Sequence, residues 1–123
     1  MNSKYFEVAR KAAYKSDFKA RVGACLVIKG RMFVGFNRGQ KTHAKSPHMY
    51  HSIHAEFDAI RQAGLRNPDL KYGEIYIYRL KKDNSPGLAK PCSPCLDFLK
   101  LCGIKKFFYT GEDGFYSYDS KEL

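Results

Sequence analysis

IYIYRLKKDNSPGLAKPCSPCLDFLKLCGIKKFFYT, residues 75–110, predicts a strand, a helix and a second strand in succession. Ile75–Tyr78 has the β-branched and aromatic composition of a strand. A helix is expected from about Ser93 to Cys102, and Ile104–Thr110 has strand composition again. Because a helix connects the two strands, we expect them to be parallel in one sheet.

The residues before this segment predict two more helices and a hairpin. A first helix is expected over roughly residues 4–16, where apolar side chains recur at helical spacing. Gly23–Ile28 is predicted to be a strand, with Met32–Asn37 as its antiparallel partner across a tight turn. A second helix follows, with Ser52 as its expected N-cap and Gly64 at its end.

After the last predicted helix and strand, Phe115–Tyr118 is expected to pair back as a final strand. The predicted order is α-β-β-α-β-α-β-β, a five-stranded mixed sheet with flanking helices in the α/β class. Residues 1–123 should form a single domain, because the chain has ordinary domain length and contains no repeat or linker. The loops over 38–51 and 81–91 precede helices, and the first is too long for a simple connection.

The chain has four cysteines, no apolar run of membrane-spanning length and no signal-peptide core after Met1. We therefore expect a cytoplasmic protein whose cysteines stay reduced. Cys25 lies in an apolar run and Cys102 ends an amphipathic segment, so both are expected to be buried small hydrophobes. Cys92 and Cys95 form a Cys-x-x-Cys pair, which indicates a metal site or a redox site.

The net charge is strongly positive, since 22 Lys and Arg outnumber 12 Asp and Glu to give +10. No acidic residue occurs from Phe18 through Ala55, and a second basic cluster lies within residues 79–90. A solvated basic surface and a polyanionic partner both fit this pattern.

His54 and the Cys92–Cys95 pair each follow a loop and stand at the predicted start of a helix. Cysteines three residues apart place both sulfurs on one helical face, and a histidine from a neighbouring helix completes a His-Cys-Cys set. Three protein ligands leave the fourth tetrahedral position open to water, as in catalytic zinc sites. We therefore predict one Zn²⁺ held by His54, Cys92 and Cys95.

Glu56 lies two residues after His54, too close to be a comfortable fourth ligand from the same helix. It is instead the predicted catalytic residue, carrying protons between the attacking water and the base. A Cys-x-x-Cys pair alone also fits a redox site or half of a structural zinc site. His51 is the candidate for the fourth ligand of a structural site. With three ligands and a water instead, His43, His48 and His51 are loop or substrate contacts, and for each alone we favour an ordinary surface or packing role.

His-Ala-Glu at 54–56 and Pro-Cys-Ser-Pro-Cys at 91–95 form the H-x-E…P-C-x-x-C signature of zinc deaminases. With these motifs the chain resembles the cytidine deaminase superfamily over nearly its whole length. The resemblance implies a cytidine-deaminase-like three-layer fold. It also implies that Asn37, which ends a Gly-x-Asn stretch, contacts the substrate and that the backbone N–H of Ala55 binds the base carbonyl.

Two subgroups of the superfamily share features with the chain. The Ser-Pro-Cys at 93–95 is similar to that of polynucleotide cytidine deaminases of the APOBEC/AID group, which adds Ser93 to the substrate-binding candidates. Residues 54–60 look closer to the deoxycytidylate deaminases, which usually carry Asn where this chain has Asp58.

Aromatic residues crowd the last two predicted strands. Alternate members must face the core, and Phe107 is expected there. Tyr109 lies near the end of its strand, so we expect it to border the pocket and stack on a base.

These features together predict a hydrolytic cytosine deaminase that converts C to U with release of ammonia. We favour cytosine in single-stranded DNA or RNA as the substrate, because the loops next to both zinc helices are basic. The alternative is a free substrate, dCMP or cytidine, and a remote alternative is a non-catalytic, zinc-stabilised nucleic-acid-binding module. The expected nucleic-acid contacts are Arg38, Lys41, Lys45, Lys81, Lys82 and Lys90.

Overall fold

The computed structural model describes residues 3–17, 20–39, 52–89, 93–104, 106–111 and 114–119, with the backbone alone at 3, 38–39, 52–53, 93–95 and 114–119. Three α-helices are present in this part of the chain: α1 (Ser3–Ala13), α2 (Ala55–Ala63) and α3 (Ser93–Leu101). The main strands are β1 (Arg21–Ile28), β2 (Arg31–Phe36), β5 (Glu74–Leu80), β7 (Lys106–Gly111) and β8 (Gly114–Asp119). The shorter elements are β3 (Arg38–Gly39), β4 (Ser52–Ile53), β6 (Pro86–Gly87) and a 3₁₀ turn, η1 (Pro68–Tyr72). No helix among the described residues has the length and apolar character needed to cross a membrane.

The main strands form an open sheet in the order β2-β1-β5-β7-β8. β5 and β7 are parallel, as predicted from the helix that connects them, and the other neighbours along this path are antiparallel. The last strand therefore returns antiparallel to β7. The short β6 pairs with the end of β5, opposite Arg79 and Leu80.

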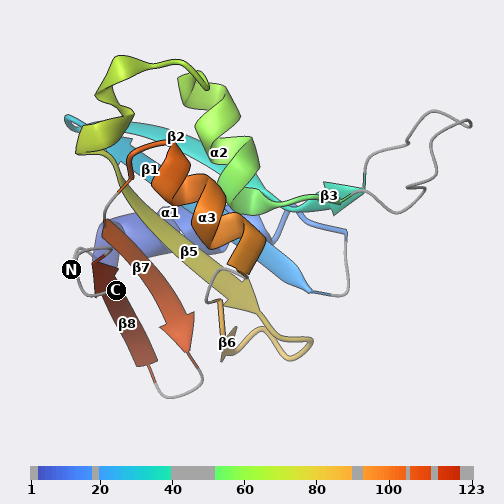
Figure 1. Cartoon of the computed structure of the whole chain (residues 1–123). Helices are drawn as coiled ribbons and strands as arrows, with labels where there is room; N and C mark the ends of the chain where they lie inside the picture. The colour runs from blue at the N-terminus through green and yellow to red at the C-terminus, as the bar shows by residue number, and fades with distance from the viewer. Residues whose placement is uncertain are drawn as a thin grey trace, which may run out of the picture.

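Helices cover both faces of the sheet (Figure 1). On one face α1 packs Phe6, Ala9 and Ala13 against Cys25 and Tyr76. On the other face α2 and α3 lie over a separate cluster, whose sheet members are Ala24, Leu26, Ile28, Ile75, Ile77 and Phe107. The alternation of strand side chains between the two clusters confirms the three-layer prediction.

Two glycines let the helices approach the sheet closely. A Cβ at Gly23 would lie 2.0 Å from the carbonyl oxygen of Ala9 in α1. On the opposite face, a Cβ at Gly35 would lie 2.4 Å from the backbone nitrogen of Ala59 in α2. A side chain at either glycine would therefore push its helix away from the sheet.

Several predicted boundaries were wrong. Ser52 does not cap α2: it lies in β4, paired with Gly39, and the helix begins at Ala55 with His54 as its N-cap. The pairing of β3 with β4 holds residues 52–53 in an extended conformation that excludes a helix start there. α1 ends at Ala13 instead of near residue 16, because the following turn uses bonds to carbonyls three residues back. The loop predicted over 81–91 contains β6, and 40–51 lie outside the described residues.

Candidate active site

The functional end of the molecule is the end of the sheet where β2, β5 and β7 finish. Gly23 of β1 pairs with Phe36 of β2 on one side and with Tyr78 of β5 on the other. Because β7 runs parallel to β5, its last residues lie at the same end. The first turns of α2 and α3 also lie toward this end of β5 (Figure 1).

His54 is the N-cap of α2. Its backbone is extended (φ −73°, ψ 149°), and its carbonyl oxygen accepts the first helical hydrogen bond from the N–H of Asp58 at 3.0 Å. Its side chain makes no capping hydrogen bond and is exposed. The imidazole therefore stands at the start of the helix, outside the core, where it can serve as a ligand.

The next two residues of the motif are buried. Ala55 is 1% exposed and Glu56 is 5% exposed, in the first turn of α2. The N–H groups of a first helical turn have no acceptor within the helix, so the turn suits a carboxylate and can donate to a carbonyl oxygen of a ligand. The structure thus has a buried carboxylate in the first turn of α2, two residues from the exposed imidazole of His54.

α3 lies beside α2. The rings of Phe57 in α2 and Phe98 in α3 are 5.3 Å apart between centroids, and Leu99 shares a buried cluster with Ala55. α3 begins at Ser93, so the last three residues of Pro-Cys-Ser-Pro-Cys form its start. Both motifs therefore stand at the starts of two packed helices.

The ligand set fits zinc as far as the structure describes it. An exposed imidazole at the start of α2 and a Cys-x-x-Cys segment at the start of α3 provide the nitrogen and sulfur donors that zinc prefers. Cys92 and the thiol of Cys95 lie outside the described residues, so the three-ligand set remains a prediction. His43, His48 and His51 also lie outside them.

The other two cysteines are not placed for this site. Cys25 is completely buried on the face covered by α1, opposite α2 and α3. Burial raises the pKa of the Cys25 thiol to about 11, which keeps it protonated at neutral pH. Cys102 is half-buried against the α2–α3 cluster, and burial raises its pKa too. Cys25 is thus the buried small hydrophobe that was predicted, whereas Cys102 is only partly buried.

Asn37 lies just beyond β2, at the functional end of the sheet. Its Oδ1 accepts a hydrogen bond from the N–H of Val22 at 2.8 Å, and its Nδ2 donates to the carbonyl oxygen of Ala20. Its own N–H donates to the carbonyl oxygen of Val22. The side-chain amide thus holds the residues that enter β1, and its contact with a substrate stays a prediction.

Tyr109 and Phe107 lie in β7 and differ in burial. Tyr109 lies opposite Ile77, half-buried against the cluster under α2 and α3, while Phe107 is in the core as predicted. A contact between Tyr109 and a base stays a prediction. Ser93 is described only as the first residue of α3.

Thr110 was missed by the sequence analysis. It is completely buried; its Oγ1 accepts from the N–H of Arg79 at 3.1 Å and donates to the carbonyl oxygen of Gly87 at 2.7 Å. Its carbonyl oxygen accepts from the N–H of Ala89 at 2.8 Å. Thr110 therefore ties residues 87–89, which lead into the cysteine motif, to β5 and β7. No local sequence pattern reports such distant partners.

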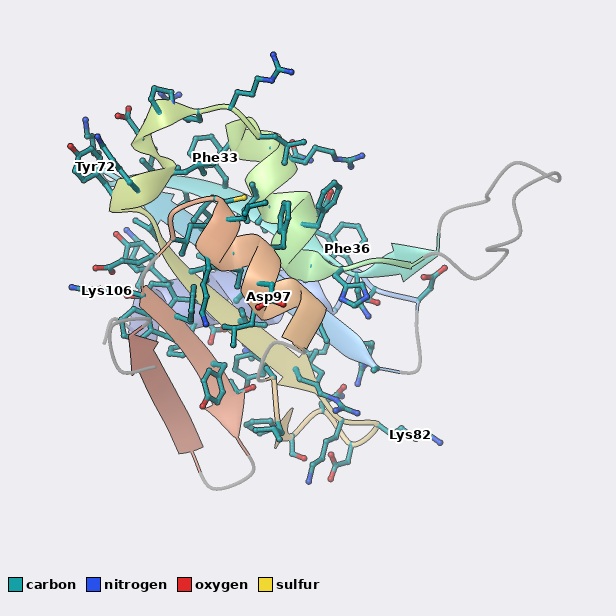
Figure 2. The ribbon with its side chains drawn as sticks, in the orientation of Figure 1. Phe33, Phe36, Tyr72, Lys82, Asp97 and Lys106 are labelled. Atoms are coloured by element: carbon teal, nitrogen blue, oxygen red, sulfur yellow. The ribbon has the colours of Figure 1, made fainter. Side chains whose placement is uncertain are left out.

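The predicted nucleic-acid contacts are described only in part. Lys81 and Lys82 are exposed in the turn after β5, and the Lys82 side chain extends away from the body of the protein (Figure 2). Arg21 supports this turn, because its Nη2 donates to the carbonyl oxygen of Lys81 and to Oδ1 of Asn84. Three of the other predicted contacts, Lys41, Lys45 and Lys90, and the side chain of Arg38 lie outside the described residues.

Comparisons with known proteins identify the family and the fold. Residues 1–111 match the family model of the cytidine and deoxycytidylate deaminase zinc-binding region. No curated protein matches the chain. Among solved structures, cytidine deaminase from Burkholderia pseudomallei is similar, with a TM-score of 0.74 and 18% identity over 99% of this chain and 94% of that chain.

Two further structures share the fold. For dCMP deaminase from the cyanophage S-TIM5, the TM-score is 0.66 at 21% identity over 89% of this chain and 81% of that chain. For cytidine deaminase from Mycobacterium leprae, it is 0.58 at 17% identity over 94% and 91%. The match to the family model covers most of the chain, including both motifs. The chain therefore belongs to the cytidine and deoxycytidylate deaminase family, zinc-dependent hydrolases that remove the amine of cytosine.

Proposed function

We propose that this protein hydrolyses the exocyclic amine of the cytosine base of a nucleoside or nucleotide. The observation that carries the proposal is the pairing of an exposed imidazole, His54, with a buried carboxylate, Glu56, at the start of α2. α3 begins beside this turn with the residues of the cysteine motif. A binding module has no use for a buried carboxylate at this position, which favours catalysis over zinc-stabilised nucleic-acid binding.

His54, Cys92 and Cys95 are the residues that would hold zinc. When bound, zinc lowers the pKa of a coordinated water toward neutrality and so supplies a nucleophile. The contribution of the protein is to keep the imidazole at the helix start and to hold the cysteine segment beside it, through the contact of Phe57 with Phe98.

Glu56 would carry the protons. Its carboxylate takes a proton from the attacking water and gives it to the ring nitrogen N3, which makes C4 of the base more electrophilic. The water oxygen bonds to C4, Glu56 moves the remaining proton of that oxygen to N4, and the C4–N4 bond breaks to release ammonia as the C4 carbonyl forms. Glu56 lies in the first turn of α2, and its burial keeps the carboxylate away from bulk water.

The base would be held by the first turn of α2 and the end of β7. The N–H of Ala55 is proposed to donate to the carbonyl oxygen of the base, because N–H groups of a first helical turn have no helical acceptor. Tyr109 is proposed to line the same space, with Asn37 and Ser93 as further contacts to the nucleotide. The core packing of Ala55 and of the strand carrying Tyr109 supports a rigid site.

The direct test is turnover by the purified, zinc-loaded protein. Ammonia and the deaminated base are measured with dCMP, cytidine, a cytosine-containing single-stranded oligonucleotide and adenosine. Uracil formed with matching ammonia from any cytosine substrate supports the proposal. No product from any cytosine substrate at full zinc occupancy would overturn it.

A free nucleotide is the first candidate for the substrate. The three similar structures named above are cytidine and dCMP deaminases, and a further cyanophage structure is of the dCMP deaminase in complex with dCMP and dUMP. Single-stranded DNA or RNA is the second candidate, supported by the net charge of +10 and by exposed Lys81 and Lys82 at the functional end. Comparing kcat/KM for dCMP with kcat/KM for the oligonucleotide, at two salt concentrations, distinguishes the two candidate substrates.

A further inference from the structure

Arg79 lies on the face of the sheet that carries the proposed active site. Alternate residues of a strand share a face, and Ile75 and Ile77 of β5 belong to the cluster under α2 and α3. Val22, which pairs with Arg79 across β1, packs against the same cluster. Arg79 is therefore the next residue on this face, where β5 leaves the core at the functional end.

The side chain of Arg79 lies across its neighbour in β6. Gly87 pairs with Arg79, and a Cβ at Gly87 would lie 3.3 Å from Cδ of Arg79 and 3.3 Å from Cγ of Lys81. The absence of a side chain at Gly87 thus leaves room for the stems of two cations on one face. The backbone N–H of Arg79 is held by Thr110, which fixes where the side chain starts.

The charge of Arg79 is exposed and weakly engaged by the protein. Nη1 donates to the carbonyl oxygen of Leu88 at 3.5 Å, and no carboxylate of the described residues forms an ion pair with the guanidinium. The nearest acid along the chain, Asp83, accepts two hydrogen bonds from Ser85 in the turn. An exposed guanidinium that forms no ion pair with the described carboxylates can form charge-assisted, bidentate hydrogen bonds with a phosphate.

We infer that Arg79 binds the phosphate attached to the sugar of the target nucleoside. This inference rests on the proposed function, and it makes the substrate a nucleotide instead of a free nucleoside. Tyr109, proposed to line the base site, lies opposite Ile77 in the parallel pair, and Ile77 precedes Arg79 on this face. A base held at the start of α2 would therefore have its phosphate on the side of the guanidinium. Lys81, next on the same face, adds positive charge.

The test compares substrates that differ only by the phosphate. kcat/KM is measured for dCMP and deoxycytidine with the zinc-loaded wild type, Arg79→Ala and Arg79→Lys. The control is Arg66→Ala, which removes an exposed cation from the turn after the far end of α2. We expect Arg79→Ala to lower kcat/KM for dCMP about 10- to 100-fold, the effect of a charge-assisted hydrogen bond, mainly through KM. Deoxycytidine should change less than about twofold, Arg79→Lys should retain part of the preference, and Arg66→Ala should match wild type.

Equal losses for dCMP and deoxycytidine would overturn the inference, since Arg79 would then act only by holding residues 87–89. Unchanged values for every phosphorylated substrate would overturn it too. The phosphate can belong to a mononucleotide or to a polynucleotide, so a short single-stranded oligonucleotide with one cytosine forms a third arm. A loss with the oligonucleotide identifies the diester as a ligand, and a loss confined to dCMP identifies the monoester.

A binding measurement separates this inference from the proposed function. dUMP and deoxyuridine are titrated into the zinc-loaded proteins by calorimetry, which needs no turnover. Tighter binding of dUMP than of deoxyuridine in wild type, lost in Arg79→Ala, supports the phosphate contact even if no cytosine substrate is converted. Equal binding of the two products by wild type would overturn it.

Discussion

Asp58 in α2 accepts a hydrogen bond through Oδ2 from the backbone N–H of Phe36, 3.2 Å away at the end of β2. Its Oδ1 accepts from Nη2 of Arg61 at 2.8 Å, and Asp58 is only 2% exposed. The carboxylate thus fastens the first turns of α2 to the strand end that precedes Asn37. It sets the distance between the helix that carries Glu56 and the residue proposed to contact the nucleotide.

Asp58→Ala should destabilise the protein by about 1–3 kcal/mol, because the N–H of Phe36 loses its acceptor in a buried region. Asp58→Asn keeps an oxygen for that N–H and should lose less. Urea unfolding of both variants measures the difference, with Asp97→Ala on the exposed side of α3 as the control. Equal losses in Asp58→Ala and Asp58→Asn would show that the ion pair with Arg61, and not the bond to Phe36, is the important contact.

Glu56→Gln should keep its zinc and its fold but lose turnover by roughly a hundredfold or more, as expected for a group that carries protons in both steps. The readouts are kcat, zinc content by elemental analysis and the unfolding midpoint. Glu7→Gln, an exposed substitution on α1 across the sheet, is the matched control and should keep normal kcat. A near-normal rate in zinc-loaded Glu56→Gln would place the proton carrier elsewhere.

The metal prediction is one zinc per chain, bound by His54, Cys92 and Cys95. Cys92→Ser should lose zinc to a competing chelator at far lower chelator concentration than wild type. Cys25→Ala and Cys102→Ala should hold zinc normally, since Cys25 lies on the opposite face of the sheet and Cys102 packs at the end of α3. Full retention in Cys92→Ser, or loss in Cys25→Ala with the fold intact, would contradict the assignment.

Thr110→Val should destabilise the protein by about 1–3 kcal/mol and weaken zinc retention. Valine has the shape of threonine but leaves the N–H of Arg79 and the carbonyl oxygen of Gly87 without their buried partner. Thr110→Ser restores the hydroxyl and should recover most of the zinc affinity. Equal behaviour of the valine and serine variants would mean that the hydroxyl does not hold residues 87–89.

Activity on a single-stranded oligonucleotide should fall steeply with salt if the polymer is the substrate. Each neutralised phosphate adds about 0.7 to the slope of log affinity against log salt. Lys81→Ala and Lys82→Ala should reduce this slope without changing zinc content, whereas Arg66→Ala should not. An inert oligonucleotide beside good turnover of dCMP would identify the free nucleotide as the substrate.

Features that depend on local composition were predicted well from the sequence. The parallel pair β5 and β7 followed from two apolar runs separated by a helix, and the antiparallel hairpin of β1 and β2 followed from the turn at Lys29 and Gly30. The sequence also placed His54 and Glu56 at the start of a helix, and α2 begins there, with His54 as its N-cap.

Features that depend on distant partners were not predicted. Ser52 has the residue type of an N-cap, but its backbone pairs with that of Gly39. No local sequence pattern predicts this pairing. The hydroxyl of Thr110 joins β7 to residues 79 and 87, and Asn37 uses its amide on Ala20 and Val22. In each case the partner is identified only once the sheet has brought the segments together.

The central position of β5 has a consequence for the order in which the molecule assembles. β5 pairs with β1 on one side and with β7 on the other. Each pairing closes a loop of the chain, one between β1 and β5 and one between β5 and β7. His54 and Glu56 belong to the segment closed by the first pairing, and Cys92 and Cys95 belong to the segment closed by the second. Closures between distant residues form slowly in folding. Zinc should therefore find its complete ligand set only late in folding, and should stabilise the finished protein by mass action instead of directing its early steps.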